Sequence, residues 1–191
     1  LPAPASPYAD FAAELRIRGF EGDLRPGDGD RLIEATDNSI YQVLPQVVLY
    51  PRGTEDLVRI ARTAAEPRFR HLVLAPRGGG TGTNGQSLTG GVVVDVSRHM
   101  NRILEINPEE RWVRVEAGVV KDQLNATLAE HGLFFPPELS TSNRATIGGM
   151  ISTDACGQGS CLYGKTSNHV LELTSVLLDG LIGAEAGTVG L

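Results

Sequence analysis

The first half of the chain alternates short apolar runs with polar turns, and this pattern predicts a strand–helix–strand unit. Residues 47–50 form an apolar strand closed by Pro51, and residues 72–75 form a second buried strand. Thr54 stands where a helix N-cap is expected, and the helix should extend to about residue 65. Its apolar residues recur at the spacing of one helix face: Leu57, Ile60, Ala61 and Ala64. This order is typical of two parallel strands joined by a crossover helix.

The pattern becomes more antiparallel in the second half. Residues 102–106 and 112–116 predict a hairpin around the turn at 107–110. The remaining pattern predicts two further helices, at 8–19 and 120–131, and two further strands, at 92–96 and 171–178. We therefore expect an α+β fold of two lobes. The first, residues 1–98, contains the βαβ unit, and the second, residues 99–191, is mainly antiparallel.

Composition excludes several classes of protein. The 191 residues are 41% hydrophobic and carry a net charge of −6. Lysine and arginine are scattered along the chain rather than clustered, so we expect no nucleic-acid partner. No apolar run approaches the roughly 20 residues that span a bilayer, and no secretory signal is visible, so we expect no transmembrane segment.

The metal-binding residue types are sparse. Only two cysteines occur, Cys156 and Cys161, which is too few for a disulfide framework or for the four ligands of an iron–sulfur cluster. The four histidines show no metal-binding spacing. We therefore predict no metal ligands in this chain, and a reducing, cytoplasmic location is the simplest expectation.

Two nucleotide-binding motifs occur, and both lack the context that they need. Residues 80–85 match G-x-G-x-x-G, but a dinucleotide-binding fingerprint must open a helix, and residues 86–91 lead directly into the strand at 92–96. Residues 159–166 match the Walker A pattern, but the strand at 171–178 follows them instead of a helix. We expect neither a Rossmann domain nor a P-loop nucleotide hydrolase.

The residues themselves predict anion binding by the backbone. Most of the 23 glycines lie in three clusters, at residues 78–91, 148–164 and 180–190. Residues 76–85, Pro-Arg-Gly-Gly-Gly-Thr-Gly-Thr-Asn-Gly, form a loop between two buried strands, and successive N–H groups in such a loop form an anion-binding nest. We expect Gly79→Asp to abolish binding, because a carboxylate adds volume and like charge beside the anion. Residues 137–149 combine small hydroxyl side chains with paired glycines, which lets a flat ring approach closely.

These segments together resemble a known family. The stretches PRGGGTGTNGQ, GVVVDVSRHMNRILEINPE, VRVEAGV, ATIGGMISTDACGQGS and YGKTSNHV look like the FAD-binding fold of the vanillyl-alcohol oxidase and p-cresol methylhydroxylase superfamily. The resemblance runs from about residue 36 to the end. TDNSIYQVLPQ and residues 137–149 look most similar to the large bacterial enzymes that join this flavin domain to an iron–sulfur region and act on D-2-hydroxyglutarate or D-lactate.

The resemblance implies an FAD cofactor, held by the first glycine loop at its pyrophosphate and by later segments along the ribityl chain and flavin ring. Members that bind flavin covalently carry histidine where Thr81 stands here, so non-covalent FAD is implied. Met150 replaces an asparagine common in the family, so no contact is assigned to its side chain. The implied cofactor-binding residues are Pro76, Arg77, Gly78, Gly79, Gly80, Thr81, Gly82, Thr83, Asn84, Pro137, Glu138, Ser140, Ala145, Thr146, Gly148, Gly149, Ser152, Gly157, Tyr163, Gly164 and Ile182.

The resemblance also implies an FAD-dependent 2-hydroxy-acid dehydrogenase whose other parts lie outside this chain. Substrate-binding groups and the catalytic base are expected in a cap domain, and a 4Fe–4S cluster in a further region. We therefore name no catalytic residue and expect the chain alone to be inactive. The electron acceptor stays open. A same-fold nucleotide-sugar reductase, or a non-redox binding module, is the alternative.

The junction between Gly180 and Leu181 is unusual. In the resembling family, several tens of residues separate the stretch that ends at Gly180 from the glycine-rich stretch that here is residues 181–191. Asp179-Gly180 favours a tight hairpin that would join them directly. The following residues alternate poorly for a paired strand, so a segment missing at this junction is the favoured interpretation.

Overall fold

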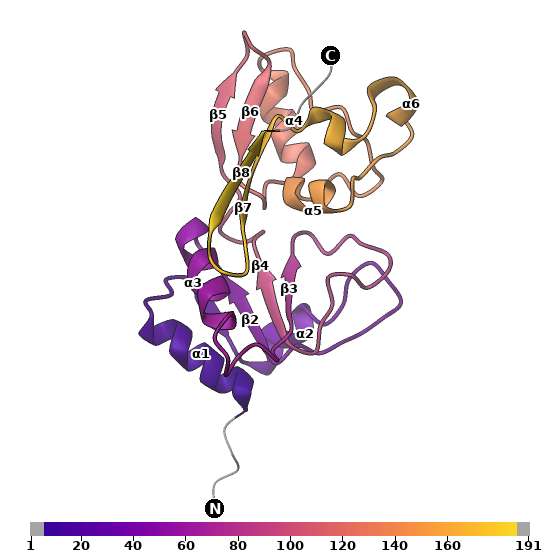
Figure 1. The fold of residues 1–191 in the computed structure, drawn as a ribbon. Helices are drawn as coiled ribbons and strands as arrows, with labels where there is room; N and C mark the ends of the chain where they lie inside the picture. Colours follow the sequence, from indigo (N-terminus) through magenta and orange to yellow (C-terminus); the bar gives the residue numbers. More distant parts are fainter. Residues whose placement is uncertain (1–5, 187–191) are drawn as a thin grey trace, which may run out of the picture. The chain divides into compact units, whose positions relative to one another are not determined.

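The computed structural model describes residues 6–186, and the chain divides into two compact units (Figure 1). Of the described residues, the first unit contains 6–77 together with 82–95 and 174–183. The second contains residues 78–81, 96–173 and 184–186. The α+β fold that the sequence predicted is confirmed. No helix among residues 6–186 has the length and apolar character needed to cross a membrane.

A four-stranded sheet forms the centre of the first unit. Its strands are β1 (Asp23–Arg25), β2 (Val47–Tyr50), β3 (Leu74–Arg77) and β4 (Val92–Asp95). The strand order is β1-β2-β4-β3, with β4 parallel to both of its neighbours and β1 antiparallel to β2. The prediction that the two strands of the βαβ unit pair with each other is therefore wrong. β4 lies between them because its valines are fully apolar and the long segment before it lets the chain return to the sheet centre.

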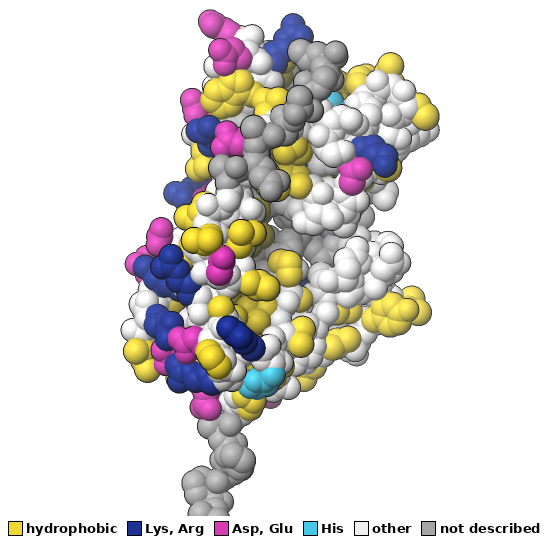
Figure 2. Space-filling model, viewed as in Figure 1, with side chains coloured by type: hydrophobic (Ala, Val, Ile, Leu, Met, Phe, Trp, Pro, Cys, Tyr) yellow, Lys and Arg dark blue, Asp and Glu magenta, His cyan; other side chains and the backbone are white. Residues whose placement is uncertain are grey.

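Two helices pack on one face of this sheet, α1 (Pro7–Ile17) and α3 (Thr54–Ala64) (Figure 1). Phe11 and Leu15 of α1 meet Ile60 of α3 in the core, as the apolar spacing predicted. The N-cap is Gly53 rather than Thr54, and it makes no side-chain cap. The outer surface of these helices carries interspersed basic and acidic side chains (Figure 2).

The opposite face of the sheet carries a smaller apolar cluster of Val48, Tyr50 and Val93. The short helix α2 (Asp28–Ile33) leads to this face, because Glu34, directly after it, accepts a hydrogen bond from the Tyr50 hydroxyl. Strand β3 starts at Leu74, two residues later than predicted, and includes Pro76. Proline is tolerated there because β3 is an edge strand of the sheet.

The second unit combines one hairpin with short helices. Strands β5 (Ile103–Asn107) and β6 (Trp112–Val115) pair antiparallel, as predicted. Helix α4 (Lys121–Ala129) buries Leu124 and Leu128, and Gly132 follows it with a positive φ. Three short helices were not predicted: α5 (Ile147–Ser152), α6 (Ser160–Tyr163) and the 3-10 helix η1 (Thr166–His169). Each has fewer than two helical turns, so no apolar residue can recur along one helix face and give a periodic signal.

Strands β7 (Glu172–Val176) and β8 (Ile182–Ala186) form a two-stranded sheet. Leu177 and Leu181 are joined by a backbone hydrogen bond of 2.9 Å, and the Gly180 N–H donates to the Leu177 carbonyl at 2.8 Å. Gly180 takes a positive φ of 76°, which closes the turn. The structure of this chain thus joins the two stretches by a direct hairpin, and the interpretation of a missing segment stays a prediction about the longer protein. Residues 187–191 of the predicted closing stretch lie outside the described residues.

Candidate cofactor-binding site

The first glycine loop leaves β3 after Arg77 and returns to the sheet at β4. Gly80 and Gly85 take positive φ angles of 61° and 72°, a conformation that other residues rarely adopt. Residues 86–91 contain no helix before β4 begins. This geometry confirms that the loop is not a Rossmann fingerprint, whose last glycine would open a helix.

The loop offers unpaired hydrogen-bond donors. Within the described part of the chain, the backbone N–H groups of residues 79–83 donate no hydrogen bond, whereas the Asn84 N–H donates to the Gln86 side chain. Free backbone donors in succession are what an anion such as a pyrophosphate requires. The loop therefore fits the phosphate portion of the implied cofactor.

Inside the second unit, the start of this loop packs against the second predicted segment. A Cβ added to Gly78 would lie 2.1 Å from Thr146 Oγ1, and one added to Gly79 would lie 1.9 Å from the Arg144 carbonyl oxygen. Arg144 Nη2 also donates to the Gly79 carbonyl at 3.2 Å. The structure thus brings together two segments that the sequence placed more than 60 residues apart. Arg144 was not among the predicted site residues.

Thr146 begins α5 rather than a loop wall, which corrects the expectation for this segment. Its hydroxyl accepts a hydrogen bond from the Gly149 N–H at 3.4 Å, and Gly148 donates to the Ala117 carbonyl at 2.8 Å. A Cβ on Gly148 would lie 2.7 Å from the Cβ of Ala117, so glycine permits this close packing. The missed signal was Thr146 itself, a favoured N-cap residue directly before an apolar residue.

Several other predicted residues have structural partners in the second unit. The Ser152 hydroxyl donates to the Gly148 carbonyl at 2.8 Å. A Cβ on Gly157 would lie 1.8 Å from the Glu138 carbonyl oxygen, so these two positions meet. The Tyr163 ring contacts Phe134 edge to face, with centroids 5.6 Å apart. Met150 is buried in the core of the unit, which explains why its side chain is apolar.

The remaining predicted residues differ in exposure. Pro137, Ala145 and Thr146 are buried, whereas Glu138, Ser140 and Tyr163 are exposed. Gly164 takes a positive φ of 79° after α6. In the first unit, Pro76, Thr83 and Asn84 are exposed, and so is Ile182 of β8. In each unit, these exposed residues are accessible to a ligand.

Arg77 is the buried exception in the first unit. Its Nε lies 2.5 Å from Glu34 Oε2, and its Nη2 donates to the Thr36 carbonyl at 2.7 Å. Burial raises the pKa of Glu34 although Arg77 acts in the opposite direction, and burial together with Glu34 raises the pKa of Tyr50 to about 12. The guanidinium therefore serves an internal ion pair, and sequence reasoning missed its partner Glu34.

The Walker-like segment and the cysteines have ordinary surroundings. Lys165 pairs with Asp154 at 3.4 Å on the surface, and η1 follows it instead of a long helix. Cys156 and Cys161 are free and exposed. The described residues contain no group of three or more His, Cys, Asp or Glu side chains that could hold a metal ion.

Comparison with known proteins assigns the chain to a family. A family model described as "FAD binding domain" matches residues 45–183. The chain is 65% identical over 178 residues to the D-2-hydroxyglutarate dehydrogenase of Pseudomonas putida. The matched residues are 93% of this chain and 18% of that protein. It is 36% identical over 147 residues to the mitochondrial D-lactate dehydrogenase (cytochrome) of Arabidopsis thaliana, covering 75% of this chain and 25% of that protein.

A solved structure of alkyldihydroxyacetonephosphate synthase has the same fold, with a TM-score of 0.79 at 21% identity, over 97% of this chain and 37% of that one. The chain belongs to the FAD-binding domain family, and its cofactor is FAD. It spans about a fifth of the length of the bacterial dehydrogenase that it matches. Both of these curated relatives are named dehydrogenases.

Proposed function

We propose that this chain is the FAD-binding domain of a dehydrogenase that oxidises a D-2-hydroxy acid to the 2-oxo acid, with D-2-hydroxyglutarate favoured over D-lactate. The observation that carries the proposal is the 65% identity to a D-2-hydroxyglutarate dehydrogenase over 93% of the chain. The lower identity to a D-lactate dehydrogenase, 36%, ranks that substrate second.

The chain's own contribution is to hold and orient the cofactor. FAD, when bound, supplies the acceptor for the hydride that the substrate α-carbon loses. The N–H groups of residues 79–83 would hold the pyrophosphate, because they have no partner among the described residues. The exposed residues of the second segment, such as Glu138 and Ser140, would lie along the rest of the cofactor. These assignments and the others predicted from the sequence are proposals.

Non-covalent attachment of FAD is part of the proposal. Thr81 offers a hydroxyl where covalent members of the resembling superfamily carry histidine, and a hydroxyl forms no such bond to flavin. A 4Fe–4S cluster, a cap domain with the catalytic base and a cytoplasmic location are further proposals for the longer polypeptide. The free, exposed thiols of Cys156 and Cys161 are compatible with a reducing compartment.

A dye-linked assay tests the substrate. The polypeptide that contains this chain, expressed at its full length, should reduce an artificial electron acceptor with D-2-hydroxyglutarate, more slowly with D-lactate, and not with L-2-hydroxyglutarate. The 191-residue chain alone should bind FAD and leave all three acids unchanged. Flavin reduction by NADPH, with no response to any hydroxy acid, would instead favour the reductase. Flavin that stays with the polypeptide after acid denaturation would contradict non-covalent binding.

A further inference from the structure

A buried polar cluster lies at the carboxyl ends of the three parallel strands of the first unit. Arg77 ends β3, Asp95 ends β4 as its direct partner in register, and Tyr50 ends β2. All three are buried, on the sheet face that also carries Val48 and Val93. The carboxyl ends of parallel strands are where ligands bind in open α/β sheets, so this cluster lies where the glycine loop begins.

The donors of Arg77 point inward rather than toward solvent. Besides the ion pair with Glu34 and the bond to the Thr36 carbonyl, Nη1 lies 3.5 Å from both the Glu34 carbonyl oxygen and Ser87 Oγ. Ser87 Oγ in turn donates to Asp37 Oδ2 at 3.2 Å. Arg77 precedes the glycine loop and Ser87 follows it. Both flanks of the loop are therefore tied to the one segment of residues 34–37.

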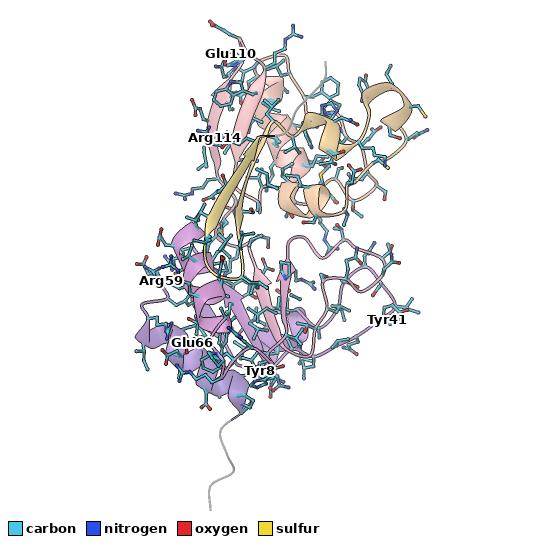
Figure 3. All side chains as sticks on the ribbon, viewed as in Figure 1. Tyr8, Tyr41, Arg59, Glu66, Glu110 and Arg114 are labelled. Carbon is cyan, nitrogen blue, oxygen red and sulfur yellow. The ribbon has the colours of Figure 1, made fainter. Side chains whose placement is uncertain are left out.

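The loop between these flanks needs such support. Residues 78–86 include five glycines, and glycine loses more conformational freedom on ordering than any other residue. A loop that is already held at both ends pays less of that entropy when it binds a ligand. The end of the loop nearest Ser87 also packs closely, because a Cβ on Gly85 would lie 3.0 Å from the ring of Tyr41, which lies on the outer loops of the unit (Figure 3).

We propose that Arg77, Glu34, Asp37 and Ser87 form a clamp that fixes both ends of the glycine loop and thereby sets the affinity for FAD, without any of these side chains touching the cofactor. This proposal rests on FAD binding by the loop. All four are positioning residues. The guanidinium fork suits this task because it bonds several acceptors in one plane, which a lysine ammonium on a flexible stem does not.

Glu34→Gln separates this role from a direct one. If Arg77 instead bound the FAD pyrophosphate, Glu34 would compete for it, and removal of the Glu34 charge would tighten FAD binding. The clamp requires the opposite: Glu34→Gln and Arg77→Lys should each weaken FAD binding by about fivefold to tenfold, as the loss of one or two charge-assisted hydrogen bonds implies. Ser87→Ala, a milder change, should weaken it by about twofold to fivefold.

The experiment measures the dissociation constant of FAD by flavin fluorescence and, in the apo chain, the hydrogen exchange of Asn84 and Leu88, whose amides donate hydrogen bonds within the loop segment. Each clamp variant should speed exchange in that loop while amides of β2 and β4 stay protected. Arg59→Lys is the matched control, because Arg59 pairs with the buried Asp56 at 3.0 Å and lies on the side of the unit away from Tyr41 (Figure 3). It should leave both the FAD affinity and the loop exchange unchanged.

Two outcomes would overturn the proposal. The first is tighter FAD binding by Glu34→Gln. The second is loss of stability in the clamp variants with FAD affinity and loop exchange at their original values, which would make the cluster merely structural. If Arg77→Lys fails to fold, Ser87→Ala and Asp37→Asn give the same readouts at more accessible positions. Failure of the original chain to bind FAD would contradict the cofactor assignment itself and is distinguishable from either outcome.

Discussion

The same glycine loop is held in two physically different ways in the two units. In the first unit, Arg77 and Ser87 hold its flanks through charged and hydroxyl side chains. In the second unit, Gly78 and Gly79 pack by close contact, against Thr146 and the Arg144 carbonyl. One attachment depends on charge and hydrogen-bond geometry, and the other depends on the absence of a side chain.

This difference shows that a glycine-rich loop need not owe its glycines to the ligand alone. Gly79 was expected to be essential because the backbone approaches a phosphate, but its missing side chain already faces the Arg144 carbonyl. Close-packed backbone does not yield to an added methyl group, whereas a hydrogen-bonded cluster tolerates partial replacement. The steric attachment should therefore give the larger mutational effects.

Gly79→Ala should produce the largest effect. The new methyl group would lie 1.9 Å from the Arg144 carbonyl oxygen, so either the loop or residues 144–146 must move. We expect the free energy of unfolding to fall by about 3 kcal/mol and FAD affinity to drop by about a hundredfold. Urea denaturation and flavin titration measure the two quantities.

Gly29→Ala is the matched control for this substitution. A Cβ on Gly29, in α2, meets no atom within 4 Å, so alanine should be neutral or stabilise the helix by up to about 1 kcal/mol. Equal losses in both variants would contradict the steric argument.

Gly78→Ala should have the next largest effect and should be partly rescued. The clash is with the Thr146 side chain, which a second substitution can remove. Gly78→Ala should cost about 2 kcal/mol and Thr146→Ala about 1 kcal/mol through the lost cap of α5. The double variant should cost clearly less than the two single costs added together, as measured by a double-mutant cycle. Strict additivity would show that the two residues do not meet.

The pH dependence of stability should have opposite signs for two glutamates, one in each unit. Burial raises the folded pKa of Glu34, so its contribution to stability is fully present below the ordinary value of 4.5 and is lost as pH rises through the folded pKa. Burial acts in the same direction on Glu116, but the hydrogen bonds from Arg102 outweigh it and lower the pKa. The contribution of Glu116 is therefore present above 4.5 and is lost as pH falls through the folded pKa.

Urea denaturation of Glu34→Gln and Glu116→Gln between pH 3 and 7, each compared with the original chain, measures these contributions. The stability of the original chain relative to Glu34→Gln should decline with rising pH. Its stability relative to Glu116→Gln should increase with rising pH, by no more than about 1 kcal/mol because Arg102 is exposed. The same sign for both variants would contradict the contrast between the units.

Lys165→Ala should have the smallest effect. Lys165 and Asp154 are both exposed, and the segment lacks the strand and long helix of a phosphate-binding loop. We expect an unchanged melting temperature and no ATP hydrolysis before or after the change. ATPase activity in the original chain that disappears in Lys165→Ala would restore the P-loop interpretation.

Local pattern was sufficient for the elements with a full period. Strand β2 has the predicted bounds, and helix α3 ends one residue from the predicted position. Both could be predicted because an apolar run and an apolar helix face are patterns of residues close together in the sequence. The loop at 78–85 was likewise visible in its glycines. α5 was missed because Gly148 and Gly149 lower helix propensity, and its stability comes from the Thr146 cap and the contact with Ala117.

The sequence by itself determined the α+β class, the glycine loop between two buried strands and, through its resemblance, FAD. Only the tertiary structure decided that β4 lies between β2 and β3, that Gly79 packs on the Arg144 carbonyl and that Arg77 pairs with Glu34. The last two pairs are 65 and 43 residues apart in the chain. Contacts between residues so far apart produce no periodic pattern in the sequence. They form because buried polar and charged groups need hydrogen-bond partners, and those partners come together only when the whole chain has folded.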